Sequence, residues 1–339
     1  MQFLWTFMIV CALFINQNAI GDDQWSETSE FHLNDYTNLV KKDGEDFRIL
    51  QLADMHVAYY IMDEFNAINR TLSLAKKAIE TYKPDLLALT GDNVTGPANM
   101  YYGKKLLAFL DQFKIPYVMV MGNHDGEAFM NKRDDLRQEK LAALFETGKY
   151  SLFKRGPSNV FGTGNYGVNI VNEKGAIIYG LVMFDTNRDY LRPDQVAWYE
   201  WYIKGLNKSV TGNEINGSEM STAPVKTLAF FHIPLTETKQ LREEWRLKDP
   251  DGERDGFRED PSSPRNNGMF QKMKELGSTT HLFFGHEHLN RLYYQYEGIY
   301  FTYGLKTGFC GYHSKDRIGT TLITIKDDSS VTVEFKPAE

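Results

Sequence analysis

Aspartate, histidine and asparagine side chains gather at five places where a short apolar run gives way to polar residues. The candidates are Asp54, His56, Asp92, Asn123, His124, Asp125, His232, His286 and His288. Imidazole and carboxylate groups in this combination suit Zn, Fe and Mn ions. The chain has only 2 Cys, so a metal site built from thiolates is excluded. Glycines directly before Asp92, Asn123 and His286 allow tight turns and a close approach of the backbone.

The number of these donors favours two metal ions over one. Seven of the side chains are candidate ligands, which exceeds a single tetrahedral or octahedral shell; they are Asp54, His56, Asp92, Asn123, His232, His286 and His288. One carboxylate can bridge two ions, because it has two oxygens. Two metals roughly 3.5–4 Å apart suit in-line displacement at phosphorus, with one ion holding the attacking hydroxide. The residues therefore predict phosphoester hydrolysis.

The elements that must position these residues alternate between strand and helix patterns. Strands are predicted at 47–52, 86–90, 117–121, 176–184, 226–231 and 281–284, and the C-terminal tail is also strand-rich. Helices are predicted at 64–82, 101–113, 132–146 and 194–205. This alternation implies mostly parallel strands covered on both faces. Ligands in such sheets bind beyond the carboxyl ends of the strands, which is where the candidates fall.

Two stretches are predicted to lack helices and strands. Residues 22–45 are polar and irregular in pattern. Residues 248–267 are charged and rich in Gly, Pro and Asp, which is typical of a long surface loop. We expect the second stretch to lie outside the sheet and to influence the choice of substrate.

The composition is that of a folded protein. The chain has 339 residues, of which 42% are hydrophobic, so it can bury a sizeable core. It carries 38 Lys and Arg against 45 Asp and Glu, giving a formal net charge of −7. This balance argues against broad nucleic-acid binding, which needs a surplus of basic side chains. With 2 Cys the chain is not a scaffold held by disulfides.

The candidate motifs resemble a known signature. They read Asp54-Met-His56, Gly91-Asp-Asn93, Gly122-Asn-His-Asp125, Phe231-His232 and Gly285-His-Glu-His288. Together they resemble the calcineurin-like metallophosphoesterases, and from about residue 47 onward the chain is similar to the small plant and fungal purple-acid-phosphatase-like branch. The resemblance implies an α/β fold, a four-layer α/β/β/α sandwich of two mixed sheets flanked by helices. The dinuclear site would lie between the sheets.

The resemblance also implies a role for each candidate. Asp54, His56 and His288 would hold the first metal, Asn123, His232 and His286 the second, and Asp92 would bridge the two. His124 would contact the phosphate and protonate the leaving group as a general acid. Asp125 would orient His124. An imidazole beside a carboxylate is chemically suited to supply that proton.

Two positions depart from the pattern of the purple enzymes. They carry a tyrosine three residues after the bridging aspartate, and this chain has Thr95 there. They usually have glycine where this chain has His56. We expect His56 to fill the ligand position of the missing tyrosine. The metal pair is left open among Fe, Mn and Zn.

Three functions remain open on the sequence. The leading prediction is a phosphomonoesterase of the acid-phosphatase type, acting on a small phosphoester or a phosphoprotein. A phosphodiesterase of nucleotides or lipid head groups would use the same site. A non-catalytic metal-binding module ranks below both, because no ligand position is missing.

The first 21 residues predict a secretory signal peptide. The apolar run at 3–15 is short for a bilayer span, and Ala19 and Gly21 are small residues before a cut at Asp22. Because Lys and Arg are absent before this run, an uncleaved anchor or a buried strand stays open. Cleavage would leave one metallophosphoesterase domain, 22–339, with no stable membrane anchor.

Sequons for N-glycosylation agree with passage through the secretory pathway. They lie at Asn69, Asn207 and Asn216. A fourth, at Asn93, lies inside the ligand motif, and we expect it to carry no glycan because a sugar there would block the site. The predicted location is secreted or vesicular, including lysosomal.

Overall fold

The computed structural model describes residues 24–58, 66–127, 135–211, 223–248, 256–262 and 265–338. The predicted signal peptide and the sequon at Asn216 lie outside the described residues.

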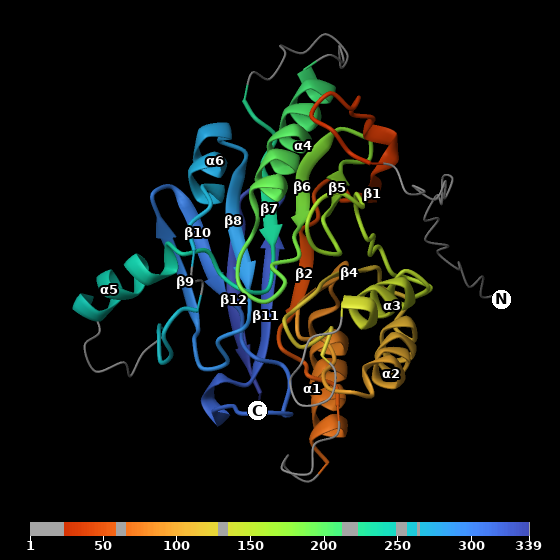
Figure 1. Cartoon of the computed structure of the whole chain (residues 1–339), viewed down its shortest axis with the longest axis vertical. Helices are drawn as coiled ribbons and strands as arrows, with labels where there is room; N and C mark the ends of the chain where they lie inside the picture. The colour runs from red at the N-terminus through yellow and green to blue at the C-terminus, as the bar shows by residue number, and fades with distance from the viewer. Residues whose placement is uncertain are drawn as a thin grey trace, which may run out of the picture.

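Two mixed sheets form the centre of the protein (Figure 1). The five-stranded sheet has the order β12 (Val331–Pro337), β11 (Gly319–Ile325), β2 (Phe47–Leu52), β3 (Leu86–Thr90), β4 (Tyr117–Val120). The seven-stranded sheet has the order β1 (Thr37–Val40), β5 (Tyr166–Val171), β6 (Ile177–Met183), β7 (Thr227–Phe230), β8 (Thr279–Phe284), β10 (Ile299–Tyr303), β9 (Leu292–Tyr296). Strands β2, β3 and β4 pair in parallel, and so do β6, β7 and β8.

Helices cover the outer face of each sheet. The five-stranded sheet packs against α1 (Ala67–Tyr82), α2 (Asn99–Asp111) and α3 (Asp135–Phe145). The seven-stranded sheet packs against α4 (Pro193–Thr211) and α6 (Met269–Leu276). The remaining helices are α5 (Thr238–Lys248) and the short 3₁₀ helices η1 (Leu33–Asp35) and η3 (Lys315–Arg317). The predicted four-layer α/β/β/α sandwich is confirmed.

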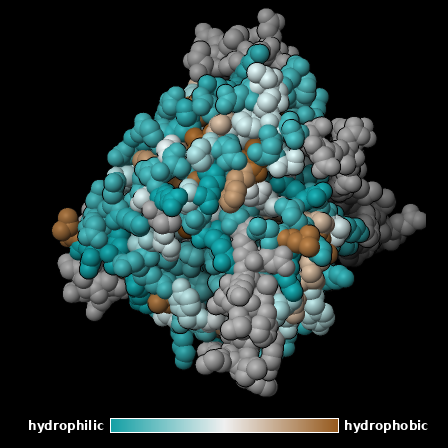
Figure 2. Space-filling model, in the orientation of Figure 1, coloured by the Kyte–Doolittle hydropathy of each residue, from teal (hydrophilic) through white to brown (hydrophobic). Residues whose placement is uncertain are grey.

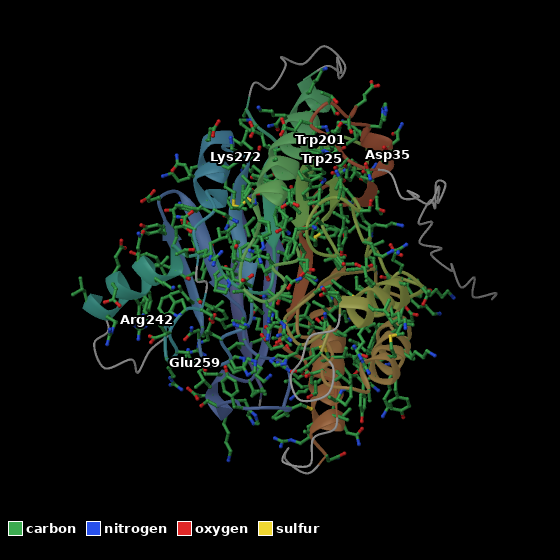
Figure 3. The ribbon with its side chains drawn as sticks, in the orientation of Figure 1. Trp25, Asp35, Trp201, Arg242, Glu259 and Lys272 are labelled. Carbon is green, nitrogen blue, oxygen red and sulfur yellow. The ribbon has the colours of Figure 1, made fainter. Side chains whose placement is uncertain are left out.

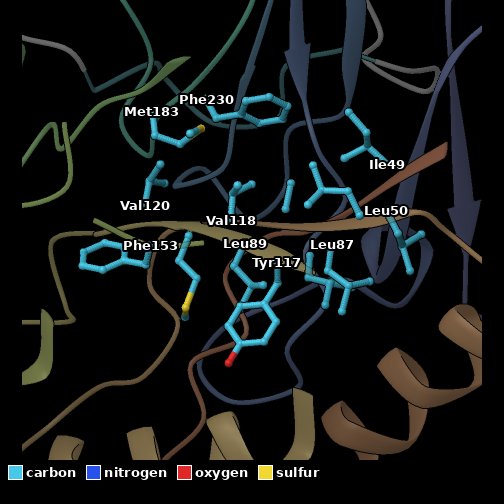
Figure 4. Close-up of a cluster of buried hydrophobic side chains, with 14 of the residues drawn as sticks. Ile49, Leu50, Leu87, Leu89, Tyr117, Val118, Val120, Phe153, Met183 and Phe230 are labelled. Atoms are coloured by element: carbon cyan, nitrogen blue, oxygen red, sulfur yellow. The ribbon is translucent and has the colours of Figure 1, made fainter. Parts of the chain in front are cut away.

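The hydrophobic core between the sheets explains the apolar strands. Met183 and Phe230 of the seven-stranded sheet belong to the same buried cluster as Val118 and Val120 of β4 (Figure 4). The opposite face of the seven-stranded sheet packs into a second cluster with α4 and α6. Strands buried on both faces must be apolar at nearly every position, which is the pattern that predicted them.

Some elements were not predicted. Strand β1 lies in the stretch expected to be irregular, and it pairs in parallel with β5 at the edge of the seven-stranded sheet. Strand β5 and helices α5 and α6 were also missed. Part of the expected surface loop packs closely: Gly256 forms a β-bridge with Arg291, and Ser262 donates its N–H to Glu287 at 2.8 Å. Residues 256–262 therefore support the turn that carries two of the candidate ligands.

The start of the described chain packs onto helix α4. Trp25 and Trp201 meet edge to face with ring centroids 6.0 Å apart, at the upper end of the molecule in Figure 3. The indole N–H of Trp201 donates to the carbonyl of Ser29 at 2.7 Å. Trp25 also exchanges two backbone hydrogen bonds with the side chain of Asn159. The segment before β1 is thus part of the fold.

The visible surface is mostly hydrophilic, with apolar side chains scattered singly over it (Figure 2). Among the described residues the exposed large hydrophobic side chains are those of Val40, Tyr101, Leu136, Leu247 and Tyr312. No helix in the described ranges has the length and apolarity needed to cross a membrane.

Candidate metal centre

The candidate ligands follow the carboxyl ends of adjacent parallel strands. Asp54 and His56 follow β2, Asp92 follows β3, and Asn123 follows β4 in the five-stranded sheet. In the facing sheet His232 follows β7, and His286 and His288 follow β8. The two sets meet between the sheets, as the sequence predicted. Because parallel strands end at a common edge, residues from distant parts of the chain are brought together here.

The backbone at four of these residues is left-handed. The φ angles are 50° at Asp54, 45° at His56, 48° at Asp92 and 75° at His286. Residues other than glycine occupy this region at a cost of about 1–2 kcal/mol each. Such strain clusters where function requires a particular side-chain direction.

The first group of donors consists of Asp54, His56, Asp92 and His288, whose ligand atoms all lie within 4.8 Å of one another. Nε2 of His56 is 3.1 Å from Nε2 of His288 and 3.4 Å from Oδ2 of Asp92. Nε2 of His288 is 3.5 Å from Oδ1 of Asp54. All four side chains are buried. Nitrogen and oxygen atoms facing one another at these separations leave a position for a cation between them.

The second group consists of Asp92, His232 and His286, again within 4.8 Å of one another. Oδ2 of Asp92 is 3.1 Å from Nε2 of His232. That nitrogen is also 3.0 Å from Oδ1 of Asn123 and 3.2 Å from Nδ1 of His286. Asp92 is therefore common to both groups, and the cluster of His and Asp side chains is suited to binding two metal ions.

Hydrogen bonds on the far side of two imidazoles fix which nitrogen faces the centre. Nδ1 of His232 donates to the carbonyl of Thr90 at 2.9 Å, which turns Nε2 toward the other donors. Nδ1 of His288 donates to the carbonyl of Tyr312 at 2.9 Å, with the same result. Metal-binding histidines in proteins are commonly oriented in this way.

The charge states also fit a metal site. Burial lowers the pKa of His56 well below its usual value, and burial together with the charge of His232 lowers that of His286 to about 3. Both imidazoles are thus neutral, as metal ligands must be. Burial opposes the ionisation of Asp92, but the charges of His232 and His124 hold its pKa well below the usual value. The residues present therefore fit a pair of cations.

His232 makes metal loading depend on pH. Burial alone would lower its pKa, but the carboxylates of Asp92 and Asp54 outweigh that effect and raise the pKa to about 10 in the metal-free protein. A metal must displace this proton, so we expect the apparent affinity to rise about tenfold per pH unit from pH 6.5 to 9. Competition with a chelator of known affinity measures this slope. The slope should be smaller in the His232→Gln variant, which lacks this proton, and equal slopes in both proteins would contradict the assignment.

Gly91 allows the strand β3 and the loop after β7 to approach each other. Its φ is +89°, and a Cβ there would lie 2.5 Å from Nδ1 of His232. Gly91→Ala should displace His232 and lower the rate of the predicted phosphoester hydrolysis by about 10²-fold, because misplacement of a group by about 1 Å has that effect on rate. Gly298 is a matched control, since its φ is +90° and a Cβ there meets nothing within 4 Å. Gly298→Ala should cost about 1 kcal/mol of stability and leave metal content unchanged. Equal losses of activity in both variants would contradict this role for Gly91.

His124 lies at the open side of the centre, but not beside its expected partner. Its side chain is 34% exposed, and its Nε2 is 4.0 Å from Oδ2 of Asp92. Asp125 is fully buried and accepts hydrogen bonds from the N–H groups of Gly122 and Val94, at 2.8 and 2.9 Å. The expectation that Asp125 orients His124 is therefore corrected. The carboxylate beside Nδ1 of His124, at 3.0 Å, belongs to Glu127.

Three residues near the centre were not identified from the sequence. Glu127 could have been noticed three residues after His124, the spacing of one turn. Lys306 is buried, and its Nζ donates to the carbonyl of Asp54 at 2.8 Å. Tyr312 stacks on His288 with ring centroids 4.2 Å apart. Lys306 belongs to no short motif. Tyr312 lies in the stretch 308–313, and only the folded chain shows that it contacts His288.

Comparison with known proteins places these features in context. Residues 47–290 match the family model described as calcineurin-like phosphoesterase. "Probable inactive purple acid phosphatase 28" of Arabidopsis thaliana is 26% identical over 93% of this chain and 83% of its own length. Phosphatase DCR2 of Saccharomyces cerevisiae is 27% identical over 74% of this chain and 46% of its own length. A dimetal phosphatase from Danio rerio aligns with 86% of this chain and 99% of its own at 11% identity, with a TM-score of 0.46.

Proposed function

Because the chain belongs to the calcineurin-like phosphoesterase family, we propose that it is an active phosphoester hydrolase dependent on two metal ions, with phosphomonoesters as its main substrates. The observation that carries this proposal is the position of Asp92. Its carboxylate is shared by two groups of donors, one holding Asp54, His56 and His288 and the other His232 and His286. This arrangement supports the ligand assignment predicted from the sequence, with Asn123 in the second group.

Each residue has a distinct task in the proposed reaction. The two donor groups would hold cations that stabilise negative charge on phosphoryl oxygens and lower the pKa of water toward neutrality. His124 stands at the exposed side of the centre, where its Nε2 can reach a leaving-group oxygen and supply a proton. Asp92 fixes the backbone of this loop as well, since its Oδ1 accepts the N–H of His124 at 2.8 Å.

A non-catalytic metal-binding module is the second candidate. The name of the Arabidopsis thaliana relative includes the word "inactive", which favours this alternative. The six Asp and His donors of the two groups, together with Asn123 beside His232 and with His124, favour catalysis. The two candidates differ in turnover and not in metal content.

The test is reconstitution of the full chain. Protein stripped of metal is loaded with Zn, Mn or Fe, alone and in pairs, and assayed with an aryl phosphate, an alkyl phosphate, a phosphopeptide and a bis-aryl phosphate. We expect turnover of monoesters only when two ions are bound. Faster turnover of the bis-aryl phosphate would instead indicate a phosphodiesterase. Two bound ions without hydrolysis of any substrate would establish the non-catalytic module.

We also propose that the protein is secreted or resides in vesicles, as a single domain from residue 22 onward. The support is the signal-like sequence at 1–21 and the packing of the chain from Trp25 onward. The side chain of Asn93 is buried and donates to the carbonyl of Val120 at 2.9 Å. This burial supports the expectation that Asn93 carries no glycan, whereas Asn69 is exposed.

A further inference from the structure

Glu127 has the geometry of a residue that positions the general acid. Its side chain is 4% exposed, although it lies beside the open side of the centre. Oε2 is 3.0 Å from Nδ1 of His124, and the N–H of Glu127 donates to the carbonyl of His124 at 3.0 Å. The two residues therefore stand on one turn, with the carboxylate folded back onto the imidazole.

A second residue holds Glu127 in place. The hydroxyl of Thr95 donates to the same oxygen, Oε2, at 2.8 Å. Thr95 is buried, at 1% exposure, and stands where the purple enzymes that this chain resembles carry a tyrosine ligand. In this chain the residue at that position holds the carboxylate of Glu127.

Two contacts orient the ring of His124. Nδ1 faces Glu127, so Nε2 faces the centre, 4.0 Å from Oδ2 of Asp92. The ring of His56 limits rotation from the other side, with its centroid 5.2 Å from that of His124. A proton donor that acts on a leaving group must keep Nε2 pointed toward it.

We propose that Glu127, held by Thr95, is the positioning residue for His124, and that it accelerates the departure of poor leaving groups. This proposal rests on the proposed phosphoester hydrolysis. As the oxygen of a water molecule bonds to phosphorus and the P–O bond to the leaving group breaks, the proton moves from Nε2 of His124 to the ester oxygen, which releases a neutral alcohol and inorganic phosphate. An alkyl leaving group needs that proton, whereas dinitrophenolate leaves without it.

The leaving-group dependence gives the test. In Glu127→Gln the amide keeps the volume of the side chain, but it can turn its NH₂ group toward Nδ1, so the ring is no longer fixed. We expect kcat for an alkyl phosphate to fall about 10²-fold, with KM and metal content unchanged. The fall for 2,4-dinitrophenyl phosphate should stay below about threefold, since little proton transfer is needed there.

Controls separate positioning from folding. Glu139 lies outside the centre and accepts a hydrogen bond from the hydroxyl of Thr163 at 2.5 Å. Glu139→Gln therefore changes a similar threonine–glutamate pair and should leave kcat for both substrates unchanged. Combining Glu127→Gln with His124→Ala should be no worse than His124→Ala alone, because both act through one proton transfer. Equal losses on both substrates in Glu127→Gln would overturn the inference. Absence of hydrolysis in the wild-type protein would instead overturn the proposed function.

Discussion

Replacement of Asp92 by asparagine is expected to remove metal-dependent hydrolysis, with kcat/KM falling by more than about 10³-fold. Asp92 belongs to both donor groups, so one substitution weakens both cation positions. A metal ion contributes several kcal/mol to the stabilisation of phosphoryl charge, and each 1.36 kcal/mol is about tenfold in rate. The neutral amide also leaves His232 without the partner that lies 3.1 Å from its Nε2. Steady-state assays and elemental analysis of the same samples measure the loss.

A matched substitution at the opposite end of β3 is the control. Asp85 precedes that strand, and its carboxylate accepts the N–H of Arg48 at 2.8 Å. Asp85→Asn should retain two metal ions and full activity. An Asp92→Asn protein that kept two ions and a tenth or more of the wild-type rate would show that Asp92 is not the shared ligand.

Replacement of His124 by alanine is expected to lower kcat for an alkyl phosphate by about 10²–10⁴-fold, the usual contribution of a general acid. In contrast to Asp92→Asn, this variant should keep both ions, because His124 is absent from both donor groups. His313 is half-buried and lies outside these groups, so kcat and metal content should be unchanged in His313→Ala. Parallel measurement of kcat and metal content distinguishes the two histidines. Full activity in His124→Ala would assign proton transfer to another group.

The metal ligands lie where the fold is under strain. Four of them have positive φ angles, and Asp54 and Asp92 are buried carboxylates. Each feature costs stability that a folded chain without a function would not need to lose. Gly91 is another residue whose conformation serves the centre, because its lack of a side chain makes room for His232. The centre therefore appears in the structure as a set of local exceptions supported by two well-packed sheets.

The parts of the fold that could be predicted are those with a strong local signal. Strands β2, β3 and β4 are buried on both faces, so their apolar runs mark them in the sequence. The ligands directly follow these strands, and the parallel arrangement brings them together. Strand β1 alternates between half-buried and exposed positions at an edge of the sheet, and such a short pattern resembles a polar loop.

The contacts that could not be predicted depend on packing between distant residues. The carboxylate of Glu127 faces His124, whereas Asp125, directly after His124, turns toward backbone N–H groups. Side chains at neighbouring positions of a turn point in different directions, so the sequence alone does not show which carboxylate contacts the imidazole of His124. The docking of residues 256–262 onto the turn after β8 likewise joins segments that no local pattern connects.

The most direct test of the metal centre is anomalous diffraction from crystals of the metal-loaded protein, with data collected on both sides of each metal absorption edge. We predict two anomalous peaks about 3.5–4 Å apart, one on each side of the Asp92 carboxylate. One should lie among Asp54, His56 and His288, and the other among Asn123, His232 and His286. A single peak, or two peaks that do not share Asp92, would contradict the dinuclear centre.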